Sequence, residues 1–314
     1  MPPEERDLIF EFFLIVLAIA VVFDLVFGEP PEFLHPVVYF GKVINYLDPR
    51  VRRLGSGIAS GVVFVIIIVI AGLLPLLIIL TAARLFLILD IFVSAYILKS
   101  TFAIRSMYEH INKVIGPLEL GNLEEARKEL SMIVRRPVDT LSEGTICSAC
   151  VESLSEGLVD GFIGPLFYFP IFGIPGSIVY RIVNTLDSNV GYKDSRNIRF
   201  GKPSAILDTV LNYIPARLAS GVLTISASLL ALRGFIPHYS DIAATESPNA
   251  GWPMSTAASF LNVKLEKEGH YIINEGHNFP TVADVRASMR LYGVSCLIFI
   301  LVWILPVLAL RTVL

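Results

Sequence analysis

The stretch IASGVVFVIIIVIAGLLPLLIIL, residues 58–80, contains no charged side chain in 23 residues. As an α-helix it measures about 34 Å, which exceeds the ~30 Å hydrocarbon core of a bilayer. The composition of the whole chain is equally apolar. Of its 314 residues, 54% are hydrophobic and 17% are charged, whereas roughly a quarter are charged in soluble domains. The composition therefore excludes a soluble monomer and predicts an integral membrane protein.

Three more apolar segments are predicted to cross the membrane. Residues 291–310 carry no charge. Residues 8–27 are apolar over most of their length, and the acidic stretch before them lacks the positive region of a cleaved signal peptide. Residues 85–98 follow the 58–80 span after a very short turn and carry Asp90 in mid-run. We expect Asp90 to face protein, as either a structural contact or a functional group.

Two further apolar segments are less regular. Residues 161–180 are uncharged but contain three prolines spaced five apart and four glycines. This pattern predicts a broken helix, which survives at membrane depth only where protein or a water-filled cavity satisfies its backbone. Residues 206–232 place polar side chains before a short apolar run, which suits a tilted, dipping or partly buried helix. Two ordinary kinked spans are the alternative interpretation.

Four polar loops connect these segments, at residues 28–56, 99–157, 181–205 and 233–290. Within the second loop, residues 119–134 repeat apolar side chains at helical spacing and predict an amphipathic helix. If both irregular segments dip and return, 21 basic residues lie on one side of the membrane and 3 on the other. This asymmetry favours the dipping arrangement with the long loops in the cytoplasm. The sequence thus predicts an all-α, multi-pass bundle with broken or re-entrant helices, forming a single polytopic membrane domain over residues 1–314.

The charge and the cysteines narrow the function. A net charge of −3 from 25 basic and 28 acidic residues argues against nucleic acid as a partner. Cys147 and Cys150 are spaced as in zinc sites, but no second pair or nearby histidine completes four ligands, so we expect buried thiols. The chain contains no phosphate-binding P-loop, no G-x-S-x-G and no H-E-x-x-H, which excludes the common ATPase, esterase and zinc-protease motifs.

An acidic stripe is the first candidate site. TICSACVESLSEGLVDG, residues 145–161, places Glu152, Glu156 and Asp160 four apart, on one face if the segment is helical. Like charges at this spacing repel unless a cation, a metal or a substrate amine compensates them. A solvated acidic face is the ordinary interpretation. The functional one is favoured because the stripe leads directly into the broken apolar segment.

Three loop motifs are further candidates. RIVNTLDSNVGYKDSRNIRFGK, residues 181–202, gathers Asn, Asp and five basic side chains around Gly191, which suits phosphate and Mg²⁺ or simply a solvated basic loop. SPNAGWPM, residues 247–254, is either an interfacial turn anchored by Trp252 or a binding loop. In GEPPEFLHP, residues 28–36, Glu29 and His35 are suited to acid–base or ligand chemistry.

Taken together and in order, these motifs resemble the CbiB/CobD family of cobalamin biosynthesis, the adenosylcobinamide-phosphate synthases. The resemblance covers almost the whole chain. Its strongest stretches are DLVFGEPPEFLHPVVYFGKVI (24–44), VESLSEGLVDGFIGPLFY (151–168), YRIVNTLDSNVGY (180–192), NYIPARL (212–218) and SPNAGWPM. Gly157 departs from the family pattern, in which Asn is more usual. Members are multi-pass membrane proteins, in agreement with the apolar segments.

The resemblance implies an amide ligation at the cell membrane, with the active site facing the cytoplasm. A carboxylate of adenosylcobyric acid would be joined to (R)-1-aminopropan-2-ol O-phosphate or to the dephosphorylated aminopropanol. ATP with Mg²⁺ is the expected energy source, because the carboxyl group needs activation and the amine must lose a proton. The implied partners are the corrinoid, the amino alcohol phosphate, the lipid bilayer and other membrane enzymes of cobalamin assembly. A membrane transporter and a non-catalytic regulatory relative are the alternatives.

The resemblance also suggests roles for individual residues. Candidate catalytic groups are Glu152, Glu156, Asp160 and Asp187, and the first, third and fourth of these are candidate Mg²⁺ ligands. Candidate phosphate-binding residues are Lys193, Arg196 and Arg217. Candidate residues for other substrate contacts are Glu29, His35, Asn184, Tyr192, Asn249 and Trp252.

Overall fold

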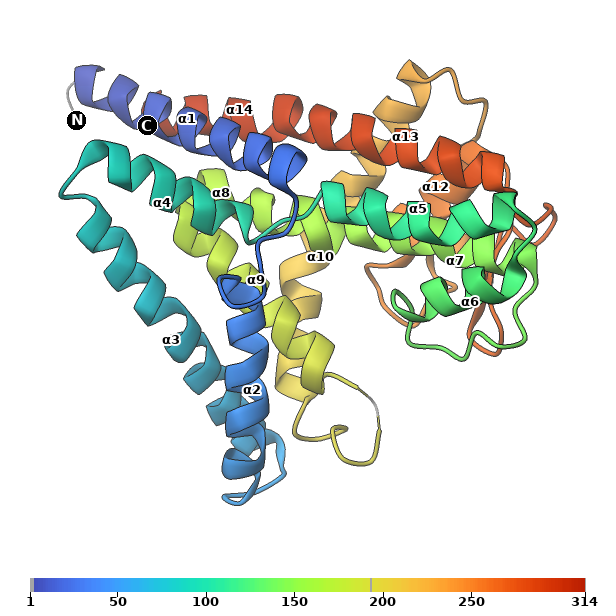
Figure 1. Cartoon of the computed structure of the whole chain (residues 1–314), viewed down its shortest axis with the longest axis horizontal. Helices are drawn as coiled ribbons and strands as arrows, with labels where there is room; N and C mark the ends of the chain where they lie inside the picture. Colours follow the sequence, from blue (N-terminus) through green and yellow to red (C-terminus); the bar gives the residue numbers. More distant parts are fainter. Residues whose placement is uncertain (1–2, 193, 314) are drawn as a thin grey trace. The chain divides into compact units, whose positions relative to one another are not determined.

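The computed structural model describes residues 3–192 and 194–313. Apart from one two-stranded hairpin, the regular elements in this part of the chain are helices, which confirms the predicted helical class (Figure 1). The chain divides into two compact units. Unit 1 contains residues 1–103, 164–212 and 302–314, and unit 2 contains residues 104–163 and 213–301. The predicted site residues are shared between them.

Unit 1 consists of α1 (Pro3–Phe27), α2 (Pro36–Arg52), α3 (Ile58–Ala83), α4 (Leu87–Lys99), α8 (Gly164–Phe172), α9 (Ile174–Val190), the first part of α10 (Lys202–Leu229) and α14 (Leu305–Val313). Helix α1 packs against α4 and α14, and α9 packs against α2, α3 and α8. These contacts place the loop between α1 and α2 beside the end of α4, as the hydrogen bond of 2.8 Å from the Tyr96 hydroxyl to the Leu34 carbonyl shows.

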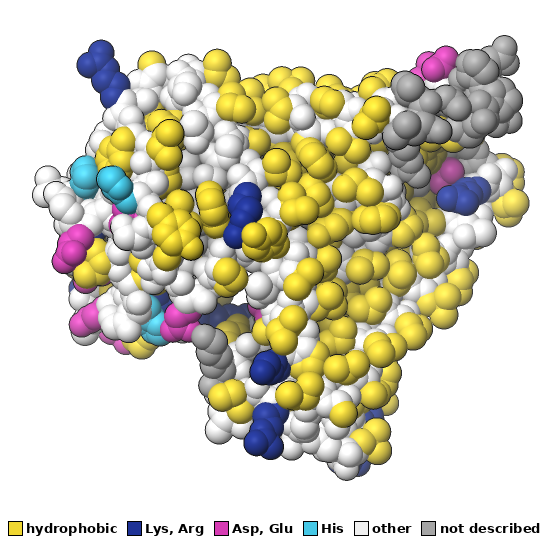
Figure 2. Space-filling model, turned by 180° about the vertical axis from the view of Figure 1, so that it is seen from behind, with side chains coloured by type: hydrophobic (Ala, Val, Ile, Leu, Met, Phe, Trp, Pro, Cys, Tyr) yellow, Lys and Arg dark blue, Asp and Glu magenta, His cyan; other side chains and the backbone are white. Residues whose placement is uncertain are grey.

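Three helices are long and apolar enough to cross a membrane: Asp7–Phe27, Ile58–Ala83 and Val282–Leu310. They include the segments predicted as spans at 8–27, 58–80 and 291–310, although the third helix begins earlier than expected. The fourth predicted span corresponds to α4, whose 13 residues measure only about 20 Å. On α3, the side chains of Ile66, Ile70, Leu74 and Ile78 are each more than half exposed. Such a stripe suits lipid, and apolar side chains cover much of the face in Figure 2.

The segment predicted to be broken, residues 161–180, is indeed interrupted. A π-helical turn, η1 (Val159–Ile163), leads into α8, which ends at Phe172, and α9 begins at Ile174 after Gly173. Gly173 has φ +70°, in the left-handed region that favours glycine, and its N–H donates 2.8 Å to the Phe169 carbonyl. Pro175 then occupies the first turn of α9, where its missing N–H costs nothing. Whether the segment re-enters the membrane stays a prediction.

Residues 206–232, which we expected to form a tilted, dipping or partly buried helix, are helical over most of the segment. Helix α10 is continuous from Lys202 to Leu229, with Pro215 inside it. Polar residues of this segment bond to one another within the helix, because the Asn212 amide donates 3.0 Å to the Asp208 carboxylate one turn earlier. The chain leaves the helix only near Ala231, which has φ +53°.

The amphipathic helix expected at 119–134 is present but shorter. Helix α5 (Arg105–Glu119) ends where it should begin, and α6 (Leu123–Ser131) starts after a turn. Gly121 supplies a φ of +73° for this turn, and the Asn122 side chain caps α6 by accepting 3.1 Å from the backbone N–H of Glu125. The apolar pattern is correct where the helix exists, since Leu130 is fully buried.

Unit 2 contains α5, α6, α7 (Glu143–Leu158), η1, the rest of α10, α11 (Tyr239–Ile242), α12 (Gly251–Leu261), β1 (Leu265–Lys267), β2 (Tyr271–Ile273), α13 (Val282–Phe299) and the start of η2 (Ile300–Ile304). Helix α7 is central, because α5, α6, α12, α13 and β1 all pack on it. The strands are antiparallel, with Lys267 opposite Tyr271. Side chains opposite each other in such a pair share one face of the hairpin.

Candidate functional site

The centre of the candidate site is helix α7, which carries Glu152 and Glu156 one turn apart. The helix begins where the Ser142 hydroxyl accepts a hydrogen bond of 3.3 Å from the backbone N–H of Thr145. Most of the helix is packed into unit 2, with Ile146 and Leu154 buried. The helical geometry predicted for the two glutamates is therefore present.

Glu152 is buried and fully engaged. The Ser148 hydroxyl donates 2.7 Å to its Oε1, and the Tyr271 hydroxyl donates 2.9 Å to its Oε2. Arg136 Nη2 lies 3.2 Å from the same Oε2, and both side chains of this ion pair are more than four-fifths buried. Ser148 also accepts 2.9 Å from the backbone N–H of Glu266, which fixes the hairpin against α7. Sequence reasoning missed Arg136 and Tyr271 entirely.

Glu156 is chemically different from Glu152 although it lies on the same helix. Glu156 is exposed at the surface, but neighbouring protein atoms exclude water from several sides of its carboxylate. This loss of solvation and the negative charge of Glu152 raise the pKa of Glu156 to about 7, while Lys267 and Arg136 oppose the rise. The cations that the acidic stripe was expected to require are thus Arg136 and Lys267.

Asp160 lies in η1, the π-helical turn that continues α7. Its place on one face with Glu152 and Glu156 stays a prediction. Burial and Glu152 also raise the pKa of the Tyr271 hydroxyl, which keeps it protonated as a hydrogen-bond donor.

A second cluster in unit 2, the Arg217 cluster, joins three predicted residues. The guanidinium of Arg217 stacks 3.5 Å from the ring centroid of Tyr213 and 5.0 Å from that of Trp252. Its Nη1 donates 3.3 Å to Asn249 Oδ1. The Ser247 hydroxyl accepts from the backbone N–H groups of the turn, so SPNAGWPM is an ordered loop at the start of α12. A cation flanked by aromatic rings suits a large flat or anionic ligand.

In unit 1, the candidate residues Glu29 and His35 contact each other. His35 Nε2 lies 2.8 Å from Glu29 Oε2, and the same oxygen accepts 2.9 Å from Lys99 Nζ. Lys99 is 3% exposed and also lies 3.3 Å from the buried carboxylate of Asp24. Burial alone would raise the pKa of Glu29, but hydrogen bonds from His35 and Lys99 lower it to about 2. In the sequence, the signal for a cation such as Lys99 is Asp24, an acidic residue within the apolar segment 8–27.

Asn184 lies in a polar network between α9 and α10. Its Oδ1 accepts 3.2 Å from Arg181 Nη1, and its amide donates 3.3 Å to Asp208. The Tyr180 hydroxyl donates 2.7 Å to Asn212 one turn further along α10. The side chain of Asn184 is 8% exposed, so in this arrangement it holds two helices together.

The end of α9 and the loop after it carry three further predicted residues. Asp187 is half-buried near the end of α9, and a Cβ at Gly191 would lie 1.9 Å from its Oδ1, so glycine leaves room for the carboxylate. Tyr192 is exposed and its hydroxyl donates 2.9 Å to the Ser188 carbonyl. Lys193 lies outside the described residues.

Arg196 is tied to two residues that the sequence did not suggest. Asp48, at the end of α2, accepts 2.6 Å from Arg196 Nη2 and 2.7 Å from Arg52 Nε. Arg52 also donates 2.7 Å to the Arg196 carbonyl and stacks 3.9 Å from the ring of Phe200. The side chain of Arg196 remains 68% exposed, so it can still reach a ligand from a fixed position.

The predicted Mg²⁺ ligands do not form a cage in either unit. Glu152 and Asp160 belong to unit 2 and Asp187 to unit 1. Among the residues that the structure describes, no three His, Cys, Asp or Glu side chains are grouped so that they could hold a metal ion. Arg136 occupies the position beside Glu152 where a cation is needed.

Comparison with known proteins agrees with the motifs. The family model described as CobD/Cbib protein matches residues 17–295. A protein of Thermoplasma volcanium named probable cobalamin biosynthesis protein CobD is 44% identical over 96% of this chain and 99% of its own length. The relative of the same name from Thermoplasma acidophilum is 42% identical over 94% and 97%. The cobalamin biosynthesis protein CobD of Dehalococcoides mccartyi is 38% identical over 83% and 87%. No solved structure matches the chain.

Proposed function

This chain belongs to the CobD/CbiB family of cobalamin biosynthesis, and we propose that it joins a carboxylate of adenosylcobyric acid to (R)-1-aminopropan-2-ol O-phosphate, or to aminopropanol, as an amide. The coarser assignment, an enzyme of cobalamin biosynthesis that acts on corrinoids, follows from the family. The ligation itself is supported by the chemistry available around α7 in unit 2.

The observation that carries the proposal is the contrast between Glu156 and Glu152. An amine attacks a carboxyl group only after it has lost its proton, and a base with a pKa near the working pH removes that proton most effectively. Glu156 has a pKa of about 7 and an accessible side chain. It is therefore the proposed acceptor of the ammonium proton.

Glu152 has a different proposed role. Ser148, Arg136 and Tyr271 engage both of its oxygens, so it does not exchange protons with a substrate. Its fixed negative charge one turn away from Glu156 raises the pKa of that carboxyl. We assign Glu152 as a positioning residue that acts through Glu156, in the manner of other carboxylate pairs whose pKa values are held apart.

The Arg217 cluster is the proposed contact for the corrinoid. Trp252 offers an apolar face, and Arg217 beside it offers a cation for a carboxylate or phosphate. Asn249 can orient an amide of the corrinoid through its side chain. In unit 1, Arg196 is a second proposed contact for phosphate, held in place by Asp48.

ATP is the proposed energy source, since its phosphoryl group would convert the carboxylate into a reactive acyl phosphate. The described residues do not fit a resident Mg²⁺, because no three suitable ligands are grouped and Glu152 is already paired with Arg136. We therefore assign the metal to the phosphates of ATP and derive no step from a protein-held ion.

The setting proposed for the reaction is the cell membrane, with several spans and the active site on the cytoplasmic side. The bilayer and the other membrane enzymes of cobalamin assembly are its proposed partners. Three apolar helices of sufficient length support the membrane setting.

The test is reconstitution of the full chain in detergent or nanodiscs with adenosylcobyric acid, Mg-ATP and either form of the amino alcohol. We expect an amide product by mass spectrometry that depends on ATP, and the preferred form of the amino alcohol shows whether phosphate is recognised. Consumption of neither substrate by well-folded protein, with every component present, would exclude the ligation.

A further inference from the structure

A pocket in unit 1 is not used by the proposed ligation. It is formed by the loop before α10 and by the first turns of that helix, and its volume is about 410 Å³. This volume lies within the range of about 300–1,000 Å³ that is usual for small-molecule sites. Lys202, Ile206 and Val210 of α10 line one side of it, and Ile198 of the loop contributes to another.

One charged group in this pocket is available to a ligand. The Tyr192 hydroxyl, which also lines the pocket, donates 2.9 Å to the Ser188 carbonyl. The side-chain amide of Asn197 donates 2.8 Å to Asp194. By contrast, the exposed ammonium group of Lys202 has neither an ion pair nor a hydrogen-bond partner among the residues that the structure describes.

The surface beside this cation is apolar. Ile198, Ile206 and Val210 are each more than half exposed. On α10, positions 202, 206 and 210 are successively four apart, so the lysine and the two apolar side chains lie on one face of the helix. A cation followed by an apolar strip suits an amphiphile. A soluble phosphate compound would leave the strip in contact with water.

The pocket also lies in a basic region. Segments 48–58 and 194–202 carry six basic residues against two acidic ones, although the net charge of the chain is −3. The two segments are in contact, because Arg52 donates 2.7 Å to the Arg196 carbonyl. Arg199 is exposed and has no acidic partner in the described part of the chain. This local excess of positive charge attracts anionic headgroups.

Helix α3 relates the pocket to the membrane. It is one of the three helices long and apolar enough to cross a bilayer. Its start packs on the start of α10, since a Cβ at Gly61 would lie only 3.1 Å from Pro203 Cδ. Figure 1 shows both helix starts at the same end of unit 1. Lys202 directly precedes Pro203, so it lies beside the end of a candidate span, where lipid headgroups are found.

We propose that this pocket binds one anionic phospholipid. The Lys202 ammonium contacts the lipid phosphate, and one hydrocarbon chain lies along Ile206 and Val210. Arg199 adds to the attraction of the negative headgroup. The proposal does not depend on the amide ligation, because none of these residues is assigned to that reaction.

The test is native mass spectrometry of the full chain in detergent, titrated with phosphatidylglycerol or with phosphatidylcholine. We expect wild type to bind phosphatidylglycerol at least about fivefold more tightly, and Lys202→Gln to lose about this factor, the scale of one basic residue near an anionic lipid. The Kd for phosphatidylcholine should change little. Lys202 is exposed and without a partner in the described chain, so we expect the variant to fold normally.

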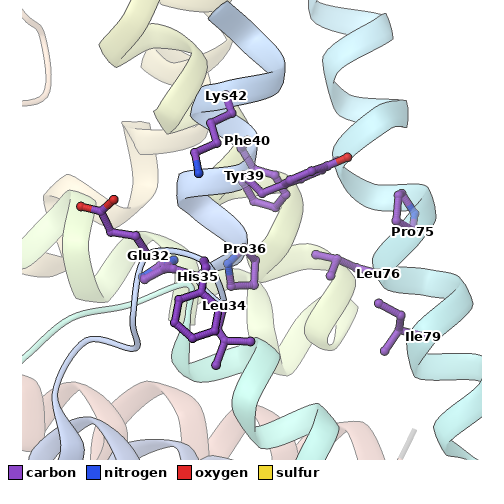
Figure 3. Close-up of a pocket in the computed structure, with 12 residues that line it drawn as sticks. Glu32, Leu34, His35, Pro36, Tyr39, Phe40, Lys42, Pro75, Leu76 and Ile79 are labelled. Carbon is purple, nitrogen blue, oxygen red and sulfur yellow. The ribbon is translucent and has the colours of Figure 1, made fainter. Parts of the chain in front are cut away.

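Lys42→Gln is the matched control. Lys42 is also an exposed lysine of unit 1, but it lies in a different pocket between α2 and α3, near Tyr39 and Phe40 (Figure 3). Its substitution should leave the Kd for phosphatidylglycerol unchanged. A loss in Lys42→Gln as large as that in Lys202→Gln would indicate a general response to charge and overturn the site.

Ile206→Ala tests the apolar part of the pocket. Loss of apolar contact should raise the Kd for phosphatidylglycerol about fivefold, whereas Ile70→Ala, an exposed position of α3 outside the pocket, should not. Glycerol phosphate, the headgroup without chains, should bind far more weakly than the lipid.

Three results contradict the proposal. Equal Kd values for the two lipids in wild type exclude selection by charge. An unchanged Kd for phosphatidylglycerol in Lys202→Gln excludes the contact with the phosphate. Glycerol phosphate bound as tightly as phosphatidylglycerol, with no effect of Ile206→Ala, would show a site for soluble phosphate instead of lipid.

Discussion

Tyr271 donates a hydrogen bond of 2.9 Å to the carboxylate of Glu152, although the two residues are 119 positions apart in the chain. The β1–β2 hairpin makes this contact possible, and its backbone is fixed to α7 through Ser148. As a consequence, the two glutamates of α7 differ in their chemistry. Glu152 is saturated with partners, and Glu156, one turn later, is left with a pKa near neutrality.

Glu156→Gln should lower the rate of amide formation by about 100-fold, the scale of losing a positioned base. Because a base acts in its ionised form, wild-type activity should rise with pH through about 7. The glutamine variant should lack this rise. The measurement is the pH–rate profile of both proteins at saturating substrate, with Glu268→Gln as the control for an exposed glutamate.

The pKa of Glu156 also affects stability. Its value in the folded protein lies above the ordinary value of 4.5, so the folded state binds its proton more tightly than the unfolded state does. The chain should therefore lose stability as the pH rises from about 4.5 to 7, and this loss should be smaller in Glu156→Gln. Thermal unfolding in detergent at pH 5 and pH 8 measures it.

Glu152→Gln should move the acid limb of the pH–rate profile to lower pH. Removing the negative charge lowers the pKa of Glu156, and the freed Arg136 lowers it further. The substitution also leaves a buried guanidinium without its counter-ion, at a cost of about 3 kcal/mol of folding stability. A purely structural role for Glu152 predicts the loss of stability with an unshifted profile.

Lys99→Met should destabilise the chain by about 3 kcal/mol, because Asp24 would remain buried without a cation. The double variant Asp24→Asn with Lys99→Met should recover part of that loss, since position 24 then carries no charge and Glu29, which also loses Lys99, keeps His35 as a partner. Unfolding by titrated denaturing detergent compares the four proteins of this cycle. Equal stability of the single and double variants would show that the ion pair is not coupled.

Cysteines introduced at Ser195 and Ser247 should be labelled from the same side of the membrane. Both serines are exposed, and the three native cysteines are buried, so little background labelling is expected. A membrane-impermeant thiol reagent applied to intact cells should react with neither site, and both should react after the cells are opened. Strong labelling of Ser195→Cys alone in intact cells would place the 181–205 loop outside and exclude the dipping arrangement.

The sequence predicted those features that depend on local pattern. Uncharged runs such as residues 58–80 identify spans through composition alone, and the prolines of 161–180 correctly indicated a broken helix. Pro215 lies inside the continuous helix α10, where neighbouring polar groups bond within the same helix. Short turns such as the one at Gly121 shortened the helix predicted at 119–134.

The partners of the site residues could not be predicted. Arg136, Tyr271 and Lys99 reach their carboxylates from distant parts of the chain, and no spacing in the sequence connects them. The same holds for Asp48, which orders Arg196 from 148 positions away. What the pattern on α7 did indicate was the need for such cations, since two adjacent glutamates on one helix face repel.

The buried contact between Lys99 and the end of α1 has a consequence for how the protein is made. Lys99 follows Glu29 by 70 positions, so at 5–20 residues per second the ribosome needs roughly 4–14 s between the two. During this interval Asp24, at the end of the first apolar helix, has no lysine to meet. Nascent chains that end before α4 therefore lack the cation that lies beside Asp24 in the folded protein.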